Sequence, residues 1–349
     1  MDYEASFLDT ISILRCVSCG KSGDIVLCEG HADFSVSFPL HDKFLSCLIC
    51  SENYPVTKDF IPIIWSDNLK AAFSGINPLE GNHNISANLE VYEGISDDYE
   101  RYTRKNYLIG ERIRSAVSVV LPSGDYVDRF HLDYACGPGH VLKWLNPLGF
   151  KQFGLDVSLL NLRNARRNTG CAVVCGDASD MPFSDNIFSL VTESSGLHHI
   201  EDWQSVLLES CRVCAYPGGV ILDSEPSKEK MAWSPLAVWV FNLRFIAYRF
   251  LSYFLKSKYI FRNTEQAKLN LLAEIHHQPG TGFPVNKLRD IFLKNEFMVD
   301  IVFSPLADLS SKANPGWKSI LLNMLSFRNP WNPNYGLFIA VAKRNRPLD

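Results

Sequence analysis

The chain has 349 residues, of which 46% are apolar, 12% aromatic and 21% charged. This length and composition predict about two globular domains and exclude a wholly disordered protein. The net charge of −4 argues against a basic protein that coats nucleic acid. The charge is uneven: residues 1–75 hold 5 basic and 10 acidic residues, whereas residues 228–349 hold 17 and 8.

The first residues, MDYEASFLDT, lack the basic start and apolar core of a signal peptide. No run of about 18 uncharged apolar residues occurs, so a membrane-spanning helix is not expected. The ten cysteines, several of them in close pairs, then predict reduced thiols and metal ligands in a cytoplasmic protein.

Two Cys-x-x-Cys pairs lie within residues 1–66. Because each pair presents two thiolates from one turn, two pairs can complete the tetrahedral sulfur shell of a structural zinc ion. The sequence therefore predicts a zinc-ribbon module with Cys16, Cys19, Cys47 and Cys50 as ligands. Its β-like runs are Asp24–Leu27, Phe34–Phe38 and Ile61–Trp65.

Residues 67–127 are polar and mixed, and we expect a linker followed by the N-terminal helices of the next domain. Between Asn88 and Val120, apolar residues such as Ile113 and Val117 recur at helical spacing.

Residues 128–225 alternate short apolar runs with helical patterns. This alternation predicts a parallel sheet covered by helices on both faces. The expected strands are Phe130–Tyr134, Gln152–Asp156, Ala172–Val174, Phe188–Thr192 and Gly219–Asp223, with helices at Leu159–Asn168 and Trp203–Val213.

The strongest site signal is HLDYACGPGH, residues 131–140, where an apolar run leads into a glycine-rich turn and a helical pattern. Glycines let the backbone approach a ligand closely, and a helix N-terminus favours polar or negative groups. Asp156 ends the second strand about 20 residues later, where a carboxylate can accept from ribose hydroxyls. Asp177 ends the third strand, and we expect it to accept from an adenine amino group.

Residues from about 90 to 225 resemble a class I S-adenosylmethionine-dependent methyltransferase, of the broad group that includes the quinone-biosynthesis C-methyltransferases. The resemblance rests on five blocks in order: LDYACGPG, GLDVS, GDASDMPFSDNIFSLV, GLHHIEDW and ESCRVCAYPGGVIL. It implies S-adenosylmethionine as cofactor. The residues implied to bind it are Asp133, Ala135, Gly137 and Gly139 at the methionine end, Asp156 and Val157 at the ribose, Asp177 and Ala178 at the adenine, and Glu193. Ala135 departs from the commoner glycine.

The activity that the resemblance implies requires donor and acceptor in line, and some acceptors must lose a proton. Glu193 and His199 sit at and just after the end of the fourth strand, and His277 lies in the region expected to face substrate. These three are the candidate bases. Two non-catalytic interpretations stay open. The LHH motif that contains His199 is frequent in the family across unlike substrates, and His277 could be a surface or capping residue.

A second zinc-ligand set is also open, because Cys28 and His31 form a Cys-x-x-His pair. That set resembles the N-terminal zinc site of a bacterial ribosomal-RNA guanine methyltransferase. The run CSENYPVTKDFIPII from Cys50 instead resembles the C-terminal half of the small zinc-ribbon activator that partners eukaryotic methyltransferases, and it favours the four-cysteine set.

Residues 232–261 contain ten aromatic residues and four basic ones. The resemblance places a substrate-covering lid here, at about 226–285. Three interpretations are open: a helical hairpin packed on the domain, a membrane-surface helix, or a surface that stacks on RNA.

Together these features predict an α/β, Rossmann-like, seven-stranded and mostly parallel sheet with helices on both faces, formed by residues 128–349. Its last strands would be Phe297–Phe303 and Gly336–Val341.

The predicted function is methyl transfer to a small molecule, hydrophobic or lipid-linked, in a cytoplasmic and membrane-associated setting. RNA-base methylation is the alternative, although the acidic module is a poor match to phosphates. A non-catalytic binding protein that kept the fold is a further alternative. The acceptor atom and the oligomeric state stay open.

Overall fold

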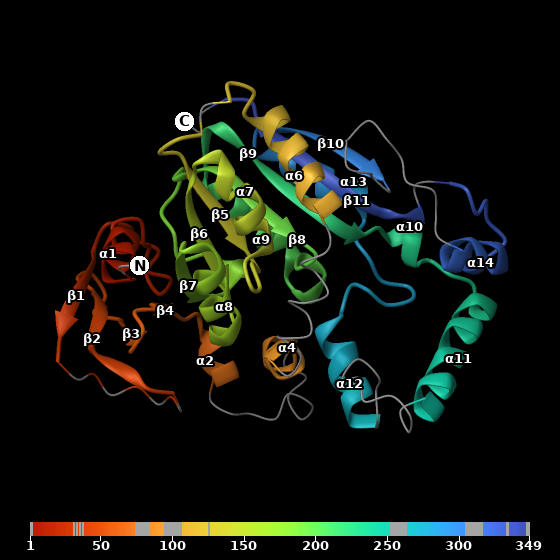
Figure 1. Ribbon diagram of the computed structural model, residues 1–349, viewed down its shortest axis with the longest axis horizontal. Coiled ribbons are helices and arrows are strands. Elements are labelled where there is room, and N and C mark those ends of the chain that lie inside the picture. Colours follow the sequence, from red (N-terminus) through yellow and green to blue (C-terminus); the bar gives the residue numbers. More distant parts are fainter. Residues whose placement is uncertain are drawn as a thin grey trace.

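The computed structural model describes residues 3–346, except residues 31, 33, 35, 37, 74–83, 94–106, 125, 252–263, 304–316, 333 and 334. Figure 1 shows a large twisted sheet flanked by helices, with a small sheet beside one of its edges. The small sheet belongs to the N-terminal part of the chain.

The N-terminal module is a three-stranded antiparallel sheet with the order β1-β2-β3. Its elements are α1 (Tyr3–Ile11), β1 (Ile25–Glu29), β2 (Leu40–Cys47) and β3 (Asn53–Thr57). The strand predicted at Phe34–Phe38 is wrong, because the described residues of that run lie outside any strand. Its apolar side chains pack without a ladder: the ring centroids of Phe34 and Trp65 lie 5.7 Å apart, and those of Phe38 and Phe73 5.5 Å apart.

The main sheet has eight strands in the order β10-β11-β9-β8-β5-β6-β7-β4. Strand β11 is antiparallel to both neighbours, and the other paired strands run parallel. The strands are β4 (Ile63–Ile64), β5 (Phe130–Tyr134), β6 (Lys151–Asp156), β7 (Ala172–Gly176), β8 (Phe188–Ser194), β9 (Cys214–Pro226), β10 (Phe297–Phe303) and β11 (Leu337–Arg344). The predicted fold class is confirmed.

The sequence predicts seven strands in this sheet, and the eighth is β4. Ile63 and Ile64 pair in parallel with Cys175 and Gly176 of β7. The run Ile61–Trp65 therefore does contain a strand, but that strand joins the main sheet instead of the small one. The cysteine-rich module and the main sheet are thus connected by backbone hydrogen bonds.

Helices cover both faces of the main sheet, as predicted. Successive side chains of a strand point to opposite faces, so the largely apolar strands present apolar side chains on both faces. On one face, α6 (Tyr107–Val120), α7 (His140–Leu145) and α8 (Leu159–Thr169) lie in a row (Figure 1). On the opposite face, α9 (Trp203–Val213) and α13 (Val285–Lys294) pack together. The remaining helices are α2 (Asp67–Phe73), α4 (Asn84–Glu93), α10 (Lys228–Met231), α11 (Pro235–Leu251), α12 (Thr264–Ala273) and α14 (Trp317–Leu325), with short 3-10 turns η1 (Asn146–Leu148), η2 (Ala178–Asp180) and η3 (Leu197–His199).

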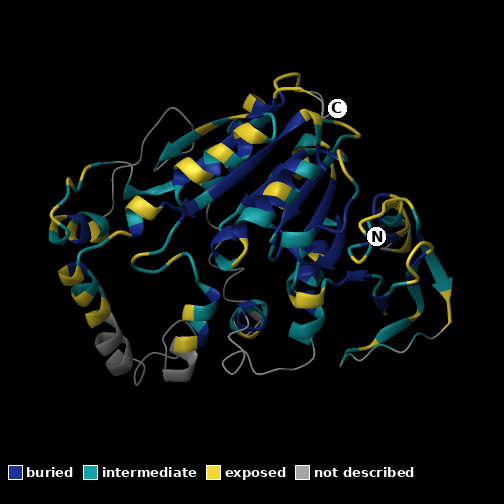
Figure 2. Ribbon diagram, turned by 180° about the vertical axis from the view of Figure 1, so that it is seen from behind, coloured by how far each residue is buried: buried dark blue, intermediate teal, exposed yellow. Residues whose placement is uncertain are grey.

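Part of the predicted aromatic segment forms α11, and residues 252–261 lie outside the described residues. Helix α11 packs against α14, and Figure 2 shows exposed residues along both. Trp239 on α11 is 61% exposed, whereas Ala237 is buried. Within the part of the chain that the structure describes, no helix combines the length and the apolar character needed to cross a membrane.

Candidate functional site

A cavity of about 410 Å³ opens at the carboxyl ends of β5, β6 and β7. In a doubly wound parallel sheet, ligands bind at this end of the strands. Most of the residues predicted to bind the cofactor line it: Asp133, Ala135, Gly137, Asp156, Val157, Asp177 and Ala178. Gly139 and Glu193 are not among the lining residues. Residues of α2, α4, α6, α7, α8 and η3 also contribute to the wall.

The Asp156 carboxylate holds the glycine turn. Its Oδ2 accepts the N–H of Gly137 at 2.8 Å, and its Oδ1 accepts the N–H of Ser158 at 2.9 Å. Because each carboxylate oxygen has two lone pairs, both can also accept from a ligand in the cavity. Asp156 therefore shapes the turn and presents acceptors beside it.

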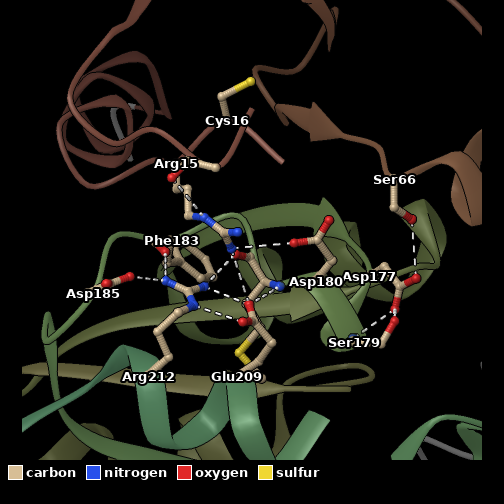
Figure 3. A network of polar contacts seen from close by, with 12 residues as sticks. Arg15, Cys16, Ser66, Asp177, Ser179, Asp180, Phe183, Asp185, Glu209 and Arg212 are labelled. Atoms are coloured by element: carbon tan, nitrogen blue, oxygen red, sulfur yellow. Dashed lines mark hydrogen bonds and ion pairs between the residues drawn. The ribbon is translucent and has the colours of Figure 1, made fainter. Parts of the chain in front are cut away.

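The Asp177 carboxylate is held from two sides. Its Oδ1 accepts the N–H of Ser179 at 2.9 Å and the hydroxyl of the same residue at 2.7 Å. Its Oδ2 accepts the hydroxyl of Ser66 at 3.2 Å, as Figure 3 shows. Ser66 directly follows the segment that contains β4, so the N-terminal part of the chain reaches the cavity wall.

Asp133 is the penultimate residue of β5 and is 1% exposed. The Thr192 hydroxyl donates to its Oδ1 at 2.7 Å and lies 2.7 Å from Nε2 of the buried His131. Burial raises the pKa of Asp133 well above its ordinary value, and the nearby Glu193 and Asp156 act in the same sense, against the Thr192 hydrogen bond. The cavity therefore has a buried carboxyl group in its wall, at the end of the central strand β5.

The glycine turn has a left-handed backbone at three positions: φ is +46° at Ala135, +51° at Gly137 and +84° at Gly139. A Cβ on Gly139 would lie 3.0 Å from the Cα of Ala165 on α8. Gly139 thus permits the close approach of the turn and α8. Ala135 adopts the left-handed conformation although it has a side chain, which costs about 1–2 kcal/mol relative to the right-handed form.

Tyr92 of α4 and His199 of η3 form one wall of the cavity. The Tyr92 hydroxyl lies 3.3 Å from His199 Nε2, and the ring centroids are 4.8 Å apart. His199 Nδ1 lies 2.9 Å from the carbonyl oxygen of Ala273. Burial lowers the pKa of His199 to about 4, with the adjacent His198 acting in the same sense, so the imidazole is neutral near pH 7. Tyr92 was not predicted, because no motif marks it in the sequence.

Glu193 is fully buried, and its carboxyl group binds backbone N–H groups instead of lining the cavity. Its Oε1 accepts the N–H groups of Gly196 and Leu197, the latter at 3.1 Å. Burial raises its pKa well above the ordinary value, and the adjacent Glu225 adds to that effect. In this structure the carboxyl group fixes the turn that leads into η3.

His277 does not line the cavity. Its Nδ1 lies 3.4 Å from Oε2 of Glu274. The same carboxylate accepts the Tyr92 hydroxyl on Oε1 at 2.8 Å and lies 3.6 Å from Nε2 of His198. Glu274 was not predicted either; its proximity to His277 along the chain was the only available sequence signal.

The four predicted zinc ligands come together in the N-terminal module. The Sγ atoms of Cys16 and Cys50 are 3.5 Å apart, those of Cys19 and Cys47 are 3.7 Å apart, and all four lie within 4.8 Å of one another. A tetrahedral site with zinc–sulfur bonds of about 2.3 Å has sulfur–sulfur edges of about 3.8 Å. The four thiols therefore fit a zinc ion in size and donor type.

Of the second possible zinc-ligand pair, Cys28 and His31, the structure describes only Cys28. Cys28 lies in β1 and is not part of the four-sulfur cluster. His31 lies outside the described residues.

The module docks on the loop that carries Asp177. Arg15 Nη1 lies 3.4 Å from Oδ1 of Asp180 and 3.4 Å from Oε2 of Glu209. Figure 3 shows this guanidinium reaching from the module to both carboxylates. Because Arg15 directly precedes Cys16, the same turn carries a zinc-ligand candidate and the docking contact.

Comparison with known proteins finds similarity in the central part of the chain. Residues 132–222 match the family model described as a methyltransferase domain. The demethylmenaquinone methyltransferase of Shouchella clausii is 37% identical over 106 residues, which cover 28% of this chain and 45% of that protein. The Thermobifida fusca enzyme of the same name is 29% identical over 155 residues, which cover 41% of this chain and 65% of that protein. The chain thus spans about half the length of the curated relatives it matches.

Solved structures with similar folds include a methyltransferase dependent on S-adenosylmethionine from Thermotoga maritima. It is 16% identical, with a TM-score of 0.41 and coverage of 74% of this chain and 99% of that one. A Haloferax volcanii complex between a methyltransferase activator and a methyltransferase gives 14% identity, a TM-score of 0.45 and coverage of 75% and 99%.

Proposed function

We propose that this protein transfers a methyl group from S-adenosylmethionine to a small-molecule acceptor. One observation carries the proposal: Asp133, Asp156 and Asp177 lie at or next to the carboxyl ends of three adjacent parallel strands and line one cavity together with the Gly137 turn. All four residues lie inside the matched methyltransferase domain.

The residues present fit this cofactor. Asp156 would accept from the ribose hydroxyls, beside Val157, and Asp177 from the adenine amino group, beside Ala178. Asp133 would face the methionine end. The bound cofactor supplies an electrophilic methyl group, and the chain has to orient the acceptor and exclude water.

The acceptor proposed is small and hydrophobic or lipid-linked. The cavity wall away from the carboxylates is largely apolar, with Ile85, Leu89, Ile109, Val141, Trp144 and Ile200 among its lining residues. Apolar walls with a few polar groups are typical of small-molecule sites. Several relatives are named for demethylmenaquinone, which supports an acceptor of this class. RNA-base methylation remains the alternative, disfavoured by the acidic N-terminal module.

We extend the proposal to zinc and to a membrane surface. Cys16, Cys19, Cys47 and Cys50 would hold a structural zinc ion, which would stabilise the module. The exposed Trp239 on α11, together with apolar residues on the adjoining α14, supports a peripheral membrane contact, since tryptophan favours the membrane interface. Flotation with anionic vesicles tests this contact, and protein that stays at the bottom of the gradient would contradict it.

The decisive experiment incubates the protein and extract with methyl-labelled S-adenosylmethionine and separates organic, aqueous, RNA and protein fractions. Label in the organic fraction is the expected result. Label in RNA would replace the proposal with the alternative. Calorimetry with S-adenosylmethionine accompanies the assay, because absence of binding would leave only a non-catalytic role.

A further inference from the structure

Outside the four cysteines, one more group of potential metal-ligating side chains converges in the described part of the chain. His198 and His199 from η3 meet Glu274, which follows α12. One ligand atom from each lies within 4.8 Å of the others. Tyr92 stands beside them, with its hydroxyl 2.8 Å from Glu274 Oε1 and 3.3 Å from His199 Nε2.

The backbone fixes which nitrogen of His199 carries hydrogen. Its Nδ1 lies 2.9 Å from the carbonyl oxygen of Ala273, and a carbonyl oxygen only accepts. The Nδ1–H therefore donates to Ala273, and in the neutral ring Nε2 presents a lone pair. That lone pair lies on the side of Tyr92 and Glu274.

His198 is held in a comparable way by a carboxyl group. Its Nδ1 lies 3.0 Å and 3.3 Å from the two oxygens of the fully buried Glu225. Its Nε2 lies on the other side of the ring, 3.6 Å from Oε2 of Glu274. A histidine whose second nitrogen is held by a carboxylate or a backbone carbonyl is the usual arrangement around a protein-bound metal ion.

These contacts leave the group with more lone pairs than protons. Two imidazole Nε2 atoms and a carboxylate converge here. Two neighbouring side chains can each supply one proton: the Tyr92 hydroxyl donates to Glu274 Oε1, and His277 Nδ1 lies 3.4 Å from Glu274 Oε2. Such a set of electron-pair donors is stabilised by a cation placed among them. Two imidazoles with one carboxylate are the ligands of several catalytic zinc and non-haem iron sites.

We propose that His198, His199 and Glu274 bind a divalent transition-metal ion, separate from the four-cysteine site. The donor set of two nitrogens and one oxygen suits zinc, cobalt, iron or manganese better than calcium. Because His199 lines the cavity, the ion would lie at the cavity wall and could coordinate an oxygen of the acceptor. That last role rests on the proposed function, whereas metal binding does not.

The test counts metal ions in the full-length protein. Metal-stripped protein is titrated with zinc against a chromophoric indicator, for the wild type and for His199→Gln and Glu274→Gln. Each variant is expected to bind one zinc ion per chain fewer than the wild type. His276→Gln is the matched control: it is the next residue but one after Glu274, outside the ligand set, and should bind as many ions as the wild type.

Cobalt identifies the donor atoms. The cobalt-loaded wild type should show a component of d–d absorption that the Glu274→Gln variant lacks, while the d–d and thiolate charge-transfer bands of the cysteine site remain in both. Circular dichroism confirms that each variant is folded. Equal zinc counts in the wild type and both variants would overturn the proposal. Calorimetry with S-adenosylmethionine on the same samples reports separately on the proposed function, so the two can fail independently.

Discussion

A Cβ atom placed on Gly196 would lie 2.6 Å from the Cβ of Ala135. Ala135 occupies the first position of the glycine turn, with φ of +46°. Gly196 lies between β8, the neighbour of β5 in the sheet, and η3. The alanine in the turn is thus accommodated because the facing residue has no side chain. The two positions are coupled, although 61 residues separate them in the sequence.

Replacing Ala135 by glycine should stabilise the protein. The left-handed conformation of an alanine costs about 1–2 kcal/mol, and glycine avoids that cost while adding some flexibility to the unfolded chain. We expect a net gain below about 1 kcal/mol, seen as a rise in the unfolding midpoint in urea. A fall in the midpoint would show that the alanine methyl contributes packing that outweighs its backbone strain.

Gly196→Ala should destabilise the protein by about 1–3 kcal/mol, because a 2.6 Å contact forces the two segments apart. In an Ala135→Gly background the same substitution should cost much less. Urea denaturation of both single variants and the double variant measures the coupling. Additive effects of the two substitutions would contradict the contact.

Asp156→Asn should weaken S-adenosylmethionine binding by about 10- to 100-fold, which corresponds to about 1.4–2.8 kcal/mol. The amide keeps the shape but loses the charge that strengthens hydrogen bonds to Gly137, to Ser158 and to a ribose. Isothermal calorimetry measures the change. Asp300→Asn, on the exposed face of β10, is the control and should bind like the wild type.

Arg15→Ala should loosen the N-terminal module from the domain. The substitution leaves Asp180 and Glu209 without this cation, at a cost of about 1 kcal/mol for partly buried pairs. Limited proteolysis between the module and residue 130 should become faster. Lys43→Ala removes an exposed pair with Glu4 inside the module and should leave the cleavage rate unchanged.

Arg112→Met should destabilise the protein by about 3–5 kcal/mol. The guanidinium of this α6 residue makes a bidentate contact at 2.7 Å and 2.8 Å with Asp223, which is fully buried in β9. Removing only the cation leaves a buried carboxylate. Chemical denaturation should show a smaller loss for Arg112→Met combined with Asp223→Asn, and an equal or larger loss would contradict this account.

Seven of the eight strands of the main sheet could be predicted, because each contains a short apolar run between helical or turn patterns. Strand β5 begins and ends at the predicted residues, Phe130 and Tyr134. The pairing of Ile63–Ile64 with β7 could not be predicted, because a two-residue strand carries no signal for a partner more than 100 residues away.

Some residues of the candidate site could likewise be predicted from the sequence, and others could not. Asp156 and Asp177 stand at the ends of predicted strands, and parallel strands bring their carboxyl ends together, so a shared cavity could be foreseen. Tyr92 and Glu274 could not be foreseen. Their contact depends on the packing of α4 against α12, and no sequence pattern indicates that these two helices are neighbours.

The position of β4 has a consequence for solubility. All five residues of β7 are buried, and β4 pairs with the side of β7 that would otherwise end the sheet. An uncovered apolar edge strand is a template for pairing with another chain. A version of the protein that starts at residue 67 would expose this edge and is expected to aggregate, so the cysteine-rich module also protects the larger domain against edge-to-edge self-association.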